Sequence, residues 1–163
     1  MKSRKFVDSV ILYAFGGRGG DGCVSFRREK YIARGGPDGG DGGNGGSVIF
    51  KTDREVDSLI QLYFTPHQRA EKGGHGKGKQ LYGRGARDLI VRIPRGTEVW
   101  NDATHELLAD LVEDGAEFVA ARGGKGGKGN MHWKTSTHQA PLEHTPGEEG
   151  EEATLRLELK LIA

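Results

Sequence analysis

The sequence predicts a mainly β chain in which a small base of strands carries long glycine-rich loops. Three observations lead to this fold class. Glycine occupies 28 of the 163 positions, the glycines are clustered, and the runs between clusters are short and rich in β-branched or aromatic residues. Glycine has no side chain to bury, so the remaining apolar residues can build only a modest core. The length corresponds to one domain, which we place over residues 1–163.

Several short apolar runs, bounded by glycine or proline, are predicted to be strands. The clearest is 154–162, where every second residue from Leu155 to Leu161 is leucine and the residues between are mostly charged, the period of a half-buried strand. Residues 94–96 (Pro-Arg-Gly) are predicted to form a turn between two strand-like runs. The runs 56–63 and 104–112 could each form a short helix. The other predicted strands are 6–15, 23–27, 47–51, 89–93 and 116–120.

The glycine clusters cover about 16–46, 73–85 and 123–129, and the glycines of 16–22, 39–46 and 123–129 recur with a period of three. Three residues per turn is the repeat of the polyproline II helix, which has no internal hydrogen bonds. Glycine along one edge lets such helices pack backbone to backbone. We therefore predict packed polyproline II segments rather than flexible linkers, the alternative for glycine-rich chain. The predicted packing glycines are Gly39, Gly42, Gly45, Gly123, Gly126 and Gly129.

The net charge of +1 conceals strong segregation of charge along the chain. Residues 66–96 carry a net charge of +6 and residues 120–135 carry +4, whereas 97–119 has seven acids and 143–152 has five, with no Lys or Arg in either. Both basic stretches lie within or beside a glycine cluster. Cations and free amides on thin loops suit a phosphate backbone, which favours RNA as a partner. The acidic stretches could face a protein partner or only water.

Three motifs resemble catalytic or metal sites but lack an essential part of each. The run Gly73–Lys79 approaches a phosphate-binding P-loop, but Gln80 stands where Ser or Thr must supply a hydroxyl to magnesium. The GxGxxG matches, such as the one that begins at Gly17, follow automatically from the period of three. Asp38, Asp41 and Asn44 are three residues apart, whereas a calcium loop needs ligands at every second position. We predict no catalytic residue, no metal site and no cofactor in this chain.

The remaining composition bounds the cellular context. Cys23 is the only cysteine, which excludes an internal disulfide, suits a reducing cytoplasm and is predicted to be a small core residue. No apolar run approaches the ~18 residues of a membrane span, and no signal peptide is recognisable. We expect a cytoplasmic monomer with no membrane contact.

Two long ordered motifs resemble the opening of the Obg family of GTPases. One is Phe26–Tyr31 (FRREKY) followed by 35–48 (GGPDGGDGGNGGSV). The other is 121–130 (ARGGKGGKGN) followed by 146–151 (PGEEGE). The run from Leu155 to Ile162 is similar to the strand that leads into that family's GTPase domain. The resemblance covers essentially the whole chain, and the P-loop and other GTP motifs are expected to lie beyond Ala163.

The resemblance implies a small β-barrel base with a bundle of left-handed polyproline II helices. It also implies a role in late assembly and checking of the large ribosomal subunit. There the glycine-rich loops reach ribosomal RNA near the peptidyl-transferase region, and the following domain binds and hydrolyses GTP with magnesium. The alternative is a protein-interaction module for regulatory or stress-response partners. In the matching stretches the resemblance makes RNA-contact candidates of Arg27, Arg28, Lys30, Arg122, Lys125 and Lys128, while charge and exposure add Lys77, Lys79, Arg84 and Arg87.

Overall fold

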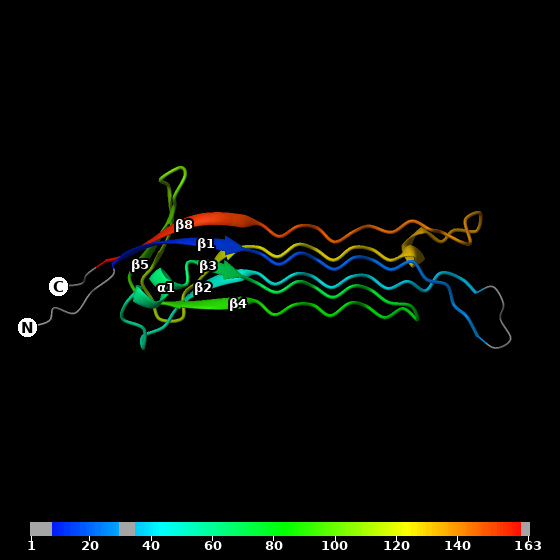
Figure 1. Ribbon diagram of the computed structural model, residues 1–163, viewed down its shortest axis with the longest axis horizontal. Coiled ribbons are helices and arrows are strands. Elements are labelled where there is room, and N and C mark those ends of the chain that lie inside the picture. Colours follow the sequence, from blue (N-terminus) through cyan, green and yellow to red (C-terminus); the bar gives the residue numbers. More distant parts are fainter. Residues whose placement is uncertain (1–7, 30–34, 161–163) are drawn as a thin grey trace, which may run out of the picture.

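The computed structural model describes residues 8–29 and 35–160. It shows an elongated molecule, with two β-sheets at one end and a bundle of extended segments projecting from them (Figure 1). The strand order is β3-β1-β8-β5-β6 in the larger sheet and β4-β2-β7 in the smaller one. Within these residues, no helix has both the length and the apolar character to cross a membrane. The elements are β1 (Ser9–Phe15), β2 (Val48–Thr52), α1 (Ile60–Phe64), β3 (His67–Arg69), β4 (Leu89–Ile93), β5 (Thr97–Asn101), β6 (Leu107–Leu111), β7 (Glu117–Ala121), the 3-10 turn η1 (Asn130–Trp133) and β8 (Glu152–Leu159).

The alternating apolar pattern of β1 and β8 explains the larger sheet. In β1, Val10, Leu12 and Ala14 are buried while the residues between them are exposed, because successive side chains point to opposite faces of a strand. β8 pairs with β1 in antiparallel register, with Leu12 opposite Leu155 and Val10 opposite Leu157. Both strands therefore present their apolar residues on the same face.

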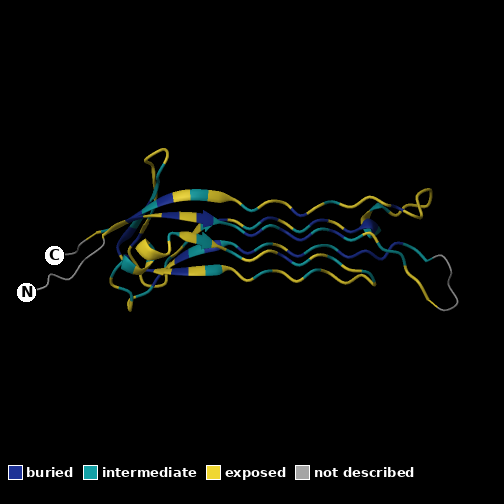
Figure 2. Cartoon of the chain, viewed as in Figure 1, coloured by how far each residue is buried: buried dark blue, intermediate teal, exposed yellow. Residues whose placement is uncertain are grey.

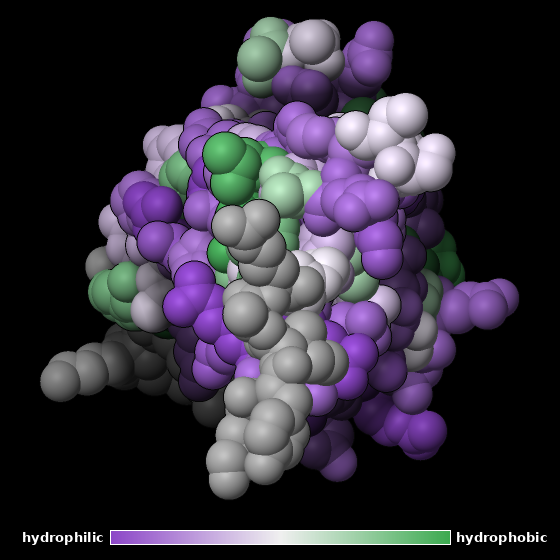
Figure 3. Space-filling view, turned by 90° about the vertical axis from the view of Figure 1, so that its right-hand side faces the viewer, coloured by the Kyte–Doolittle hydropathy of each residue, from purple (hydrophilic) through white to green (hydrophobic). Residues whose placement is uncertain are grey.

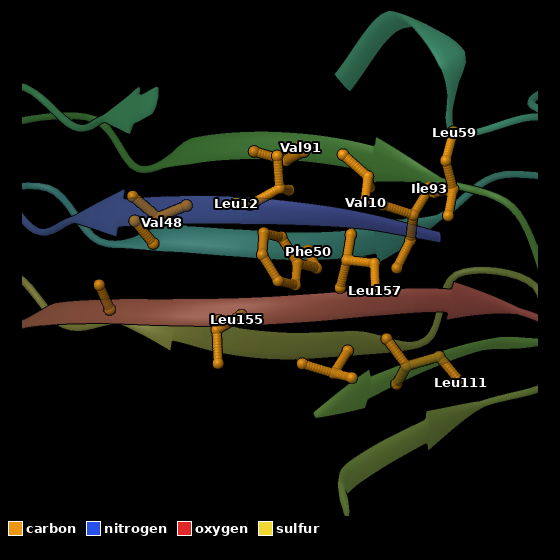
Figure 4. Close-up of a cluster of buried hydrophobic side chains, with 13 residues drawn as sticks. Val10, Leu12, Val48, Phe50, Leu59, Val91, Ile93, Leu111, Leu155 and Leu157 are labelled. Carbon is orange, nitrogen blue, oxygen red and sulfur yellow. The ribbon is translucent and has the colours of Figure 1, made fainter. Parts of the chain in front are cut away.

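That apolar face packs against the smaller sheet. β2 lies between β4, which runs parallel to it, and β7, which runs antiparallel. Side chains from the two sheets point toward one another in a single cluster (Figure 4). Phe50 of β2 is fully buried there, which contributes on the order of 1.5–3 kcal/mol relative to an exposed side chain. The core comprises Val10, Leu12, Ala14, Val48, Phe50, Leu59, Val91, Ile93, Val99, Leu111, Ala121, Leu155 and Leu157.

Five of the predicted strands overlap strands of the structure, namely β1, β2, β4, β7 and β8. The predicted turn at 94–96 leads into β5, and Gly96 has the left-handed φ of 83° that such a turn requires. The possible helix over 56–63 overlaps α1, a single turn. β3 was not predicted, because three polar residues carry no strand pattern.

Three expectations differ from the structure. Residues 23–27 are not a strand, because Val24 is exposed and only Phe26 among them forms an isolated bridge, to Pro37. The possible helix over 104–112 is instead β6, whose backbone groups pair with β5. The described strands form two sheets and no closed barrel.

The bundle consists, within the described residues, of extended segments that continue the strands of the base. We number them in chain order: segment 1 is residues 16–29, segment 2 is 35–47, segment 3 is 70–78, segment 4 is 81–88, segment 5 is 122–129 and segment 6 is 145–151. Segments 1, 3 and 5 leave β1, β3 and β7, and segments 2, 4 and 6 return to β2, β4 and β8. Buried positions recur along the inner segments, whereas the outer ones are largely exposed (Figure 2).

Backbone hydrogen bonds between segments hold the bundle together, and they recur every three residues. In segment 1 the amides of Gly16, Gly19 and Gly22 donate to carbonyls of segment 6, at 2.8 to 3.1 Å. The amides one position later, those of residues 17, 20 and 23, donate to carbonyls of segment 2. A β-strand sends its amides alternately to two neighbours with period two, so this is a different, three-sided arrangement. Segments 1 and 2 each bond to four others and form the centre.

Candidate nucleic-acid interface

The six predicted packing glycines lie where neighbouring backbones approach most closely. A Cβ built on Gly42 would stand 1.9 Å from the carbonyl oxygen of Gly20, and one on Gly126 would stand 1.8 Å from that of Gly42. The corresponding distances for Gly39, Gly45, Gly123 and Gly129 are 1.9 to 2.0 Å. These contacts leave no room for any side chain.

Polar side chains of segment 2 supply hydrogen-bond acceptors to segment 5. The amides of Gly123, Gly126 and Gly129 donate to Ser47 Oγ, Asn44 Oδ1 and Asp41 Oδ1 at 2.8 to 3.0 Å. The spacing of three that first suggested a calcium loop therefore gives side-chain acceptors for a neighbouring backbone. Sequence analysis did not find this role. Its sign in the sequence was that the polar residues of segment 2 and the glycines of segment 5 recur with the same spacing of three.

Asp21 has the same function between segments 1 and 6. The Gly147 amide donates to Asp21 Oδ1 at 2.8 Å, and Arg18 lies 3.1 Å from the same oxygen. The Gly147 amide, followed by Arg18, holds the pKa of this carboxyl below its usual range. Arg18 also pairs with Glu149 of segment 6 at 3.0 Å. Several acids of the bundle are thus committed to internal contacts.

The cations of the bundle are mostly free of such partners. Of the ten RNA-contact candidates, Lys30 lies outside the described residues and Arg27 pairs with Glu29 at 2.7 Å. The side chains of the other eight are exposed and, within the described part of the chain, their charged groups have no carboxylate within 4.0 Å and make no hydrogen bond. On the base, by contrast, cations such as Lys51 and Arg54 pair with nearby carboxylates. The eight are Arg28, Lys77, Lys79, Arg84, Arg87, Arg122, Lys125 and Lys128.

The structure sorts these cations into three groups rather than one patch. Arg122, Lys125 and Lys128 follow segment 5 at every third position. Arg84 and Arg87 line a shallow groove between segments 3 and 4, about 410 Å³ in volume, together with Lys72, which sequence analysis did not select. The third group, which includes Arg28 and Lys79, lies at the tip. Viewed from that end, the surface is mostly hydrophilic with smaller hydrophobic patches (Figure 3).

The tip holds a pocket of about 820 Å³ between the end of segment 1 and the turn that joins segments 3 and 4. Phe26, Arg28 and Val24 form one side of it, and Lys79 and Gln80 form another. Asp38 lies among these residues and is only 7% exposed. Sequence analysis selected Arg28 and Lys79 here but gave no role to Phe26 or Gln80.

The amides of the P-loop-like run are not available to a phosphate. The Gly73, Gly74 and Gly76 amides donate to carbonyls of neighbouring segments at 2.8 to 2.9 Å. The same holds for Gly17 and Gly19 in the GxGxxG match. In a nucleotide-binding loop such amides point at the ligand, whereas here they connect the bundle.

Comparisons with known proteins show the family to which this sequence belongs. A family model described as GTP1/OBG matches residues 7–161. The chain belongs to the GTP1/OBG family. It is 52% identical over 159 residues to a GTPase Obg of Magnetococcus marinus, which covers 98% of this chain and 41% of that relative. It is 51% identical to a GTPase Obg of Solibacter usitatus, over 97% of this chain and 47% of the relative. A GTPase Obg of Syntrophotalea carbinolica is 50% identical, over 98% and 45%.

The chain spans less than half the length of these GTP1/OBG relatives. The shared part is the combination of small sheets and glycine-rich bundle described above. The GTPase activity in the relatives' names belongs to proteins more than twice as long as the match. The bundle and its cations are therefore the features through which this chain's own function must be sought.

Proposed function

We propose that this chain is a ribosome-docking module that binds RNA of the large subunit through the glycine-rich bundle. The observation that carries the proposal is the set of eight exposed cations that have no ion-pair partner among the described residues, on a bundle whose acids largely bond within it. Unpaired Lys and Arg on a thin, rigid projection can each neutralise a phosphate without first breaking an ion pair. The role would lie in late assembly and checking of the large subunit, in the cytoplasm.

We further propose that GTP and magnesium bind outside the part of the family that this chain matches. The P-loop-like amides of Gly73, Gly74 and Gly76 are already bonded to carbonyls, which supports a non-enzymatic role for the bundle. Its segments would be left-handed polyproline II helices. The period of three in their hydrogen bonds supports this, as do the angles of Gly129, φ −73° and ψ 167°.

The test is co-sedimentation of the chain with purified large ribosomal subunits across a salt series. We expect binding that weakens steeply with salt, because each neutralised phosphate releases counterions. Lys125→Glu with Lys128→Glu should weaken binding and reduce the salt dependence by up to about 1.4 in log–log slope for single-stranded contacts. Both side chains are exposed and unpaired, so stability should change by less than about 0.5 kcal/mol.

A matched control reverses two cations on the base. Lys51→Glu with Arg54→Glu makes the same change in net charge far from the bundle, and should leave subunit binding unaltered. Binding that is equally strong at high salt, or equally weakened by both double variants, would refute docking through the bundle. The first of these results would instead favour the protein-interaction alternative.

A further inference from the structure

The pocket at the tip contains a buried carboxylate oxygen that no donor in the described part of the chain satisfies. Asp38 Oδ2 accepts the Lys79 amide at 3.0 Å, but within the described residues Oδ1 is buried and has no hydrogen-bond partner. A buried polar atom without a partner is costly, and such atoms in native proteins call for a ligand, water or ion. The backbone of Asp38 is fixed at both ends, since its amide donates to Ser25 O at 2.9 Å and its carbonyl accepts the Gln80 amide at 2.7 Å. The acceptor is therefore held in place before any ligand arrives.

A second observation concerns the turn on the opposite rim. Lys79 and Gln80 have φ values of 61° and 58°, in the left-handed region that favours glycine. Only His105 shares this feature among the other non-glycine residues that the structure describes. A chain with 28 glycines could place glycine at either position without strain. Residues with a strained backbone of this kind concentrate at binding sites, which indicates that Lys79 and Gln80 contact a ligand.

The chemistry of the pocket selects its ligand. An unpaired carboxylate oxygen repels a phosphate, so the inner end of the pocket requires a group that donates hydrogen bonds. Phe26 supplies an aromatic wall suited to a flat ring, and Arg28 and Lys79 supply exposed cations for an anion at the rim. One molecule that combines a flat ring, N–H donors and an outer anion is a nucleotide. At about 820 Å³ the pocket is large enough to hold one.

We propose that the tip pocket binds the base of one unpaired RNA nucleotide and favours guanine. This inference rests on the proposed RNA-docking function and deepens it. The Watson–Crick edge of guanine presents two adjacent N–H donors, which match the oxygen of Asp38. In adenine, cytosine and uracil an acceptor lies next to the donor, and its lone pair would face the carboxylate. Arg28 and Lys79 would contact the flanking phosphates.

The test is fluorescence anisotropy with labelled seven-residue RNAs that differ only at the centre, UUUGUUU, UUUAUUU and UUUUUUU. We expect the guanine oligomer to bind about tenfold more tightly than the other two. Inosine at the centre, which lacks the 2-amino group, should give an intermediate affinity. Asp38→Asn keeps the shape and the oxygen that accepts the Lys79 amide, but turns a donor toward the pocket. This variant should lose the guanine preference while its affinity for UUUUUUU stays the same.

The matched control is Asp88→Asn, which makes the same charge change at an exposed carboxylate that also accepts a backbone amide, that of Ser47 at 2.9 Å. It should retain the preference for guanine. Gly78→Ala is a second variant that keeps the Asp38 carboxylate, because its Cβ would lie 2.7 Å from Ser25 Oγ and 3.9 Å from Asp38 Oδ1, so the Ser25 hydroxyl must move and the space beside Oδ1 narrows. It should reduce the preference as well.

The outcomes separate this inference from the proposed function. Equal, salt-sensitive affinity for all oligomers would overturn the base pocket and leave RNA docking intact, as would a guanine preference that survives Asp38→Asn. Equal affinity for all oligomers is also the result expected if the pocket holds only water or a cationic side chain of a protein partner. Absence of binding to every oligomer and to the ribosomal subunit at any salt would overturn both.

Discussion

Substitution of Gly42 by alanine should destabilise the bundle through a single methyl group. The Cβ of the new residue would stand 1.9 Å from the carbonyl oxygen of Gly20, whereas ordinary contact begins at 3.4 Å. Segments 1 and 2 would therefore have to separate by about 1.5 Å near this point. The carbonyl belongs to the backbone, which cannot rotate away as a side chain would.

The cost can be assembled from two effects. Overpacking of a close contact typically costs about 1–3 kcal/mol. The separation would also stretch two hydrogen bonds between segments 1 and 2, from the Gly20 amide to Gly43 O at 2.8 Å and from the Cys23 amide to Gly40 O at 3.0 Å. Each contributes roughly 0.5–1.5 kcal/mol. We expect a loss of about 2–6 kcal/mol, which is a large part of the ~5–15 kcal/mol stability of a typical domain.

The assay is urea unfolding, with hydrogen exchange of individual amides to locate the loss. The control is Gly85→Ala, because a Cβ there meets nothing within 4 Å and the φ is not left-handed. That change should be neutral or stabilise by up to about 1 kcal/mol through the unfolded chain. In Gly42→Ala, the Gly20 amide should exchange faster while the core amides of β1 change less. Equal stability of Gly42→Ala and wild type would refute the backbone-packed bundle, as would equal losses in both variants.

Three other variants test particular contacts of the bundle. The Gly147 amide lowers the pKa of Asp21, so the ionised carboxylate stabilises the fold at pH values above the unfolded-state pKa near 3.8. This stabilisation is lost as the pH falls through the lower pKa of the folded state. Asp21→Asn should therefore lose stability less steeply below about pH 4, in acid titrations monitored by circular dichroism. The buried Asn130 side chain accepts one hydrogen bond and donates two. Asn130→Asp should therefore lower the free energy of unfolding in urea by at least about 3 kcal/mol at pH 7 and by less at pH 4. A loss under about 1 kcal/mol at pH 7 would contradict this role. Lys79→Gly with Gln80→Gly should relieve the strain of the left-handed backbone and raise stability by about 1 kcal/mol per residue, seen as a higher melting temperature. RNA binding should weaken in the same variant. An unchanged or lower melting temperature would show that the turn is not strained.

The sequence predicted the strands of the base well because their apolar residues keep period two over a whole strand. β8 is the best example, with Leu155 and Leu157 buried and charged residues between them. The strand β6 could not be predicted in this way, because Leu107 and Leu108 are adjacent and both exposed. Its extended conformation comes from pairing with β5, and that pairing is a property of the whole fold. The same limit applies to the number of sheets, since no residue pattern fixes how strands associate.

The candidate site was accessible to sequence analysis only in part. Charge and glycine context selected cations such as Lys125 and Arg87, whose side chains are exposed in the structure. Ion pairing cannot be seen in a sequence, so Arg27 was chosen together with Arg28 although the Arg27 side chain pairs with Glu29. Asp38 was noticed only as a possible calcium ligand. Its importance lies in burial at the tip against the Lys79 turn, a contact between residues 41 positions apart in the chain.

The period of three gives each position of the glycine repeat a separate task, and segment 5 shows how. Its first glycines, such as Gly126, donate to side chains of segment 2, and its second glycines, such as Gly127, donate to carbonyls of segment 1. The third position is left for Lys125 and its equivalents, which face water. The bundle therefore needs no apolar core, and a polar exterior can surround it at every level. At about 3.1 Å per residue, such a row places a cation roughly every 9 Å on a rigid support. Since hydrogen bonds already hold the backbone that carries those charges, binding loses less backbone entropy than it would on a glycine-rich coil.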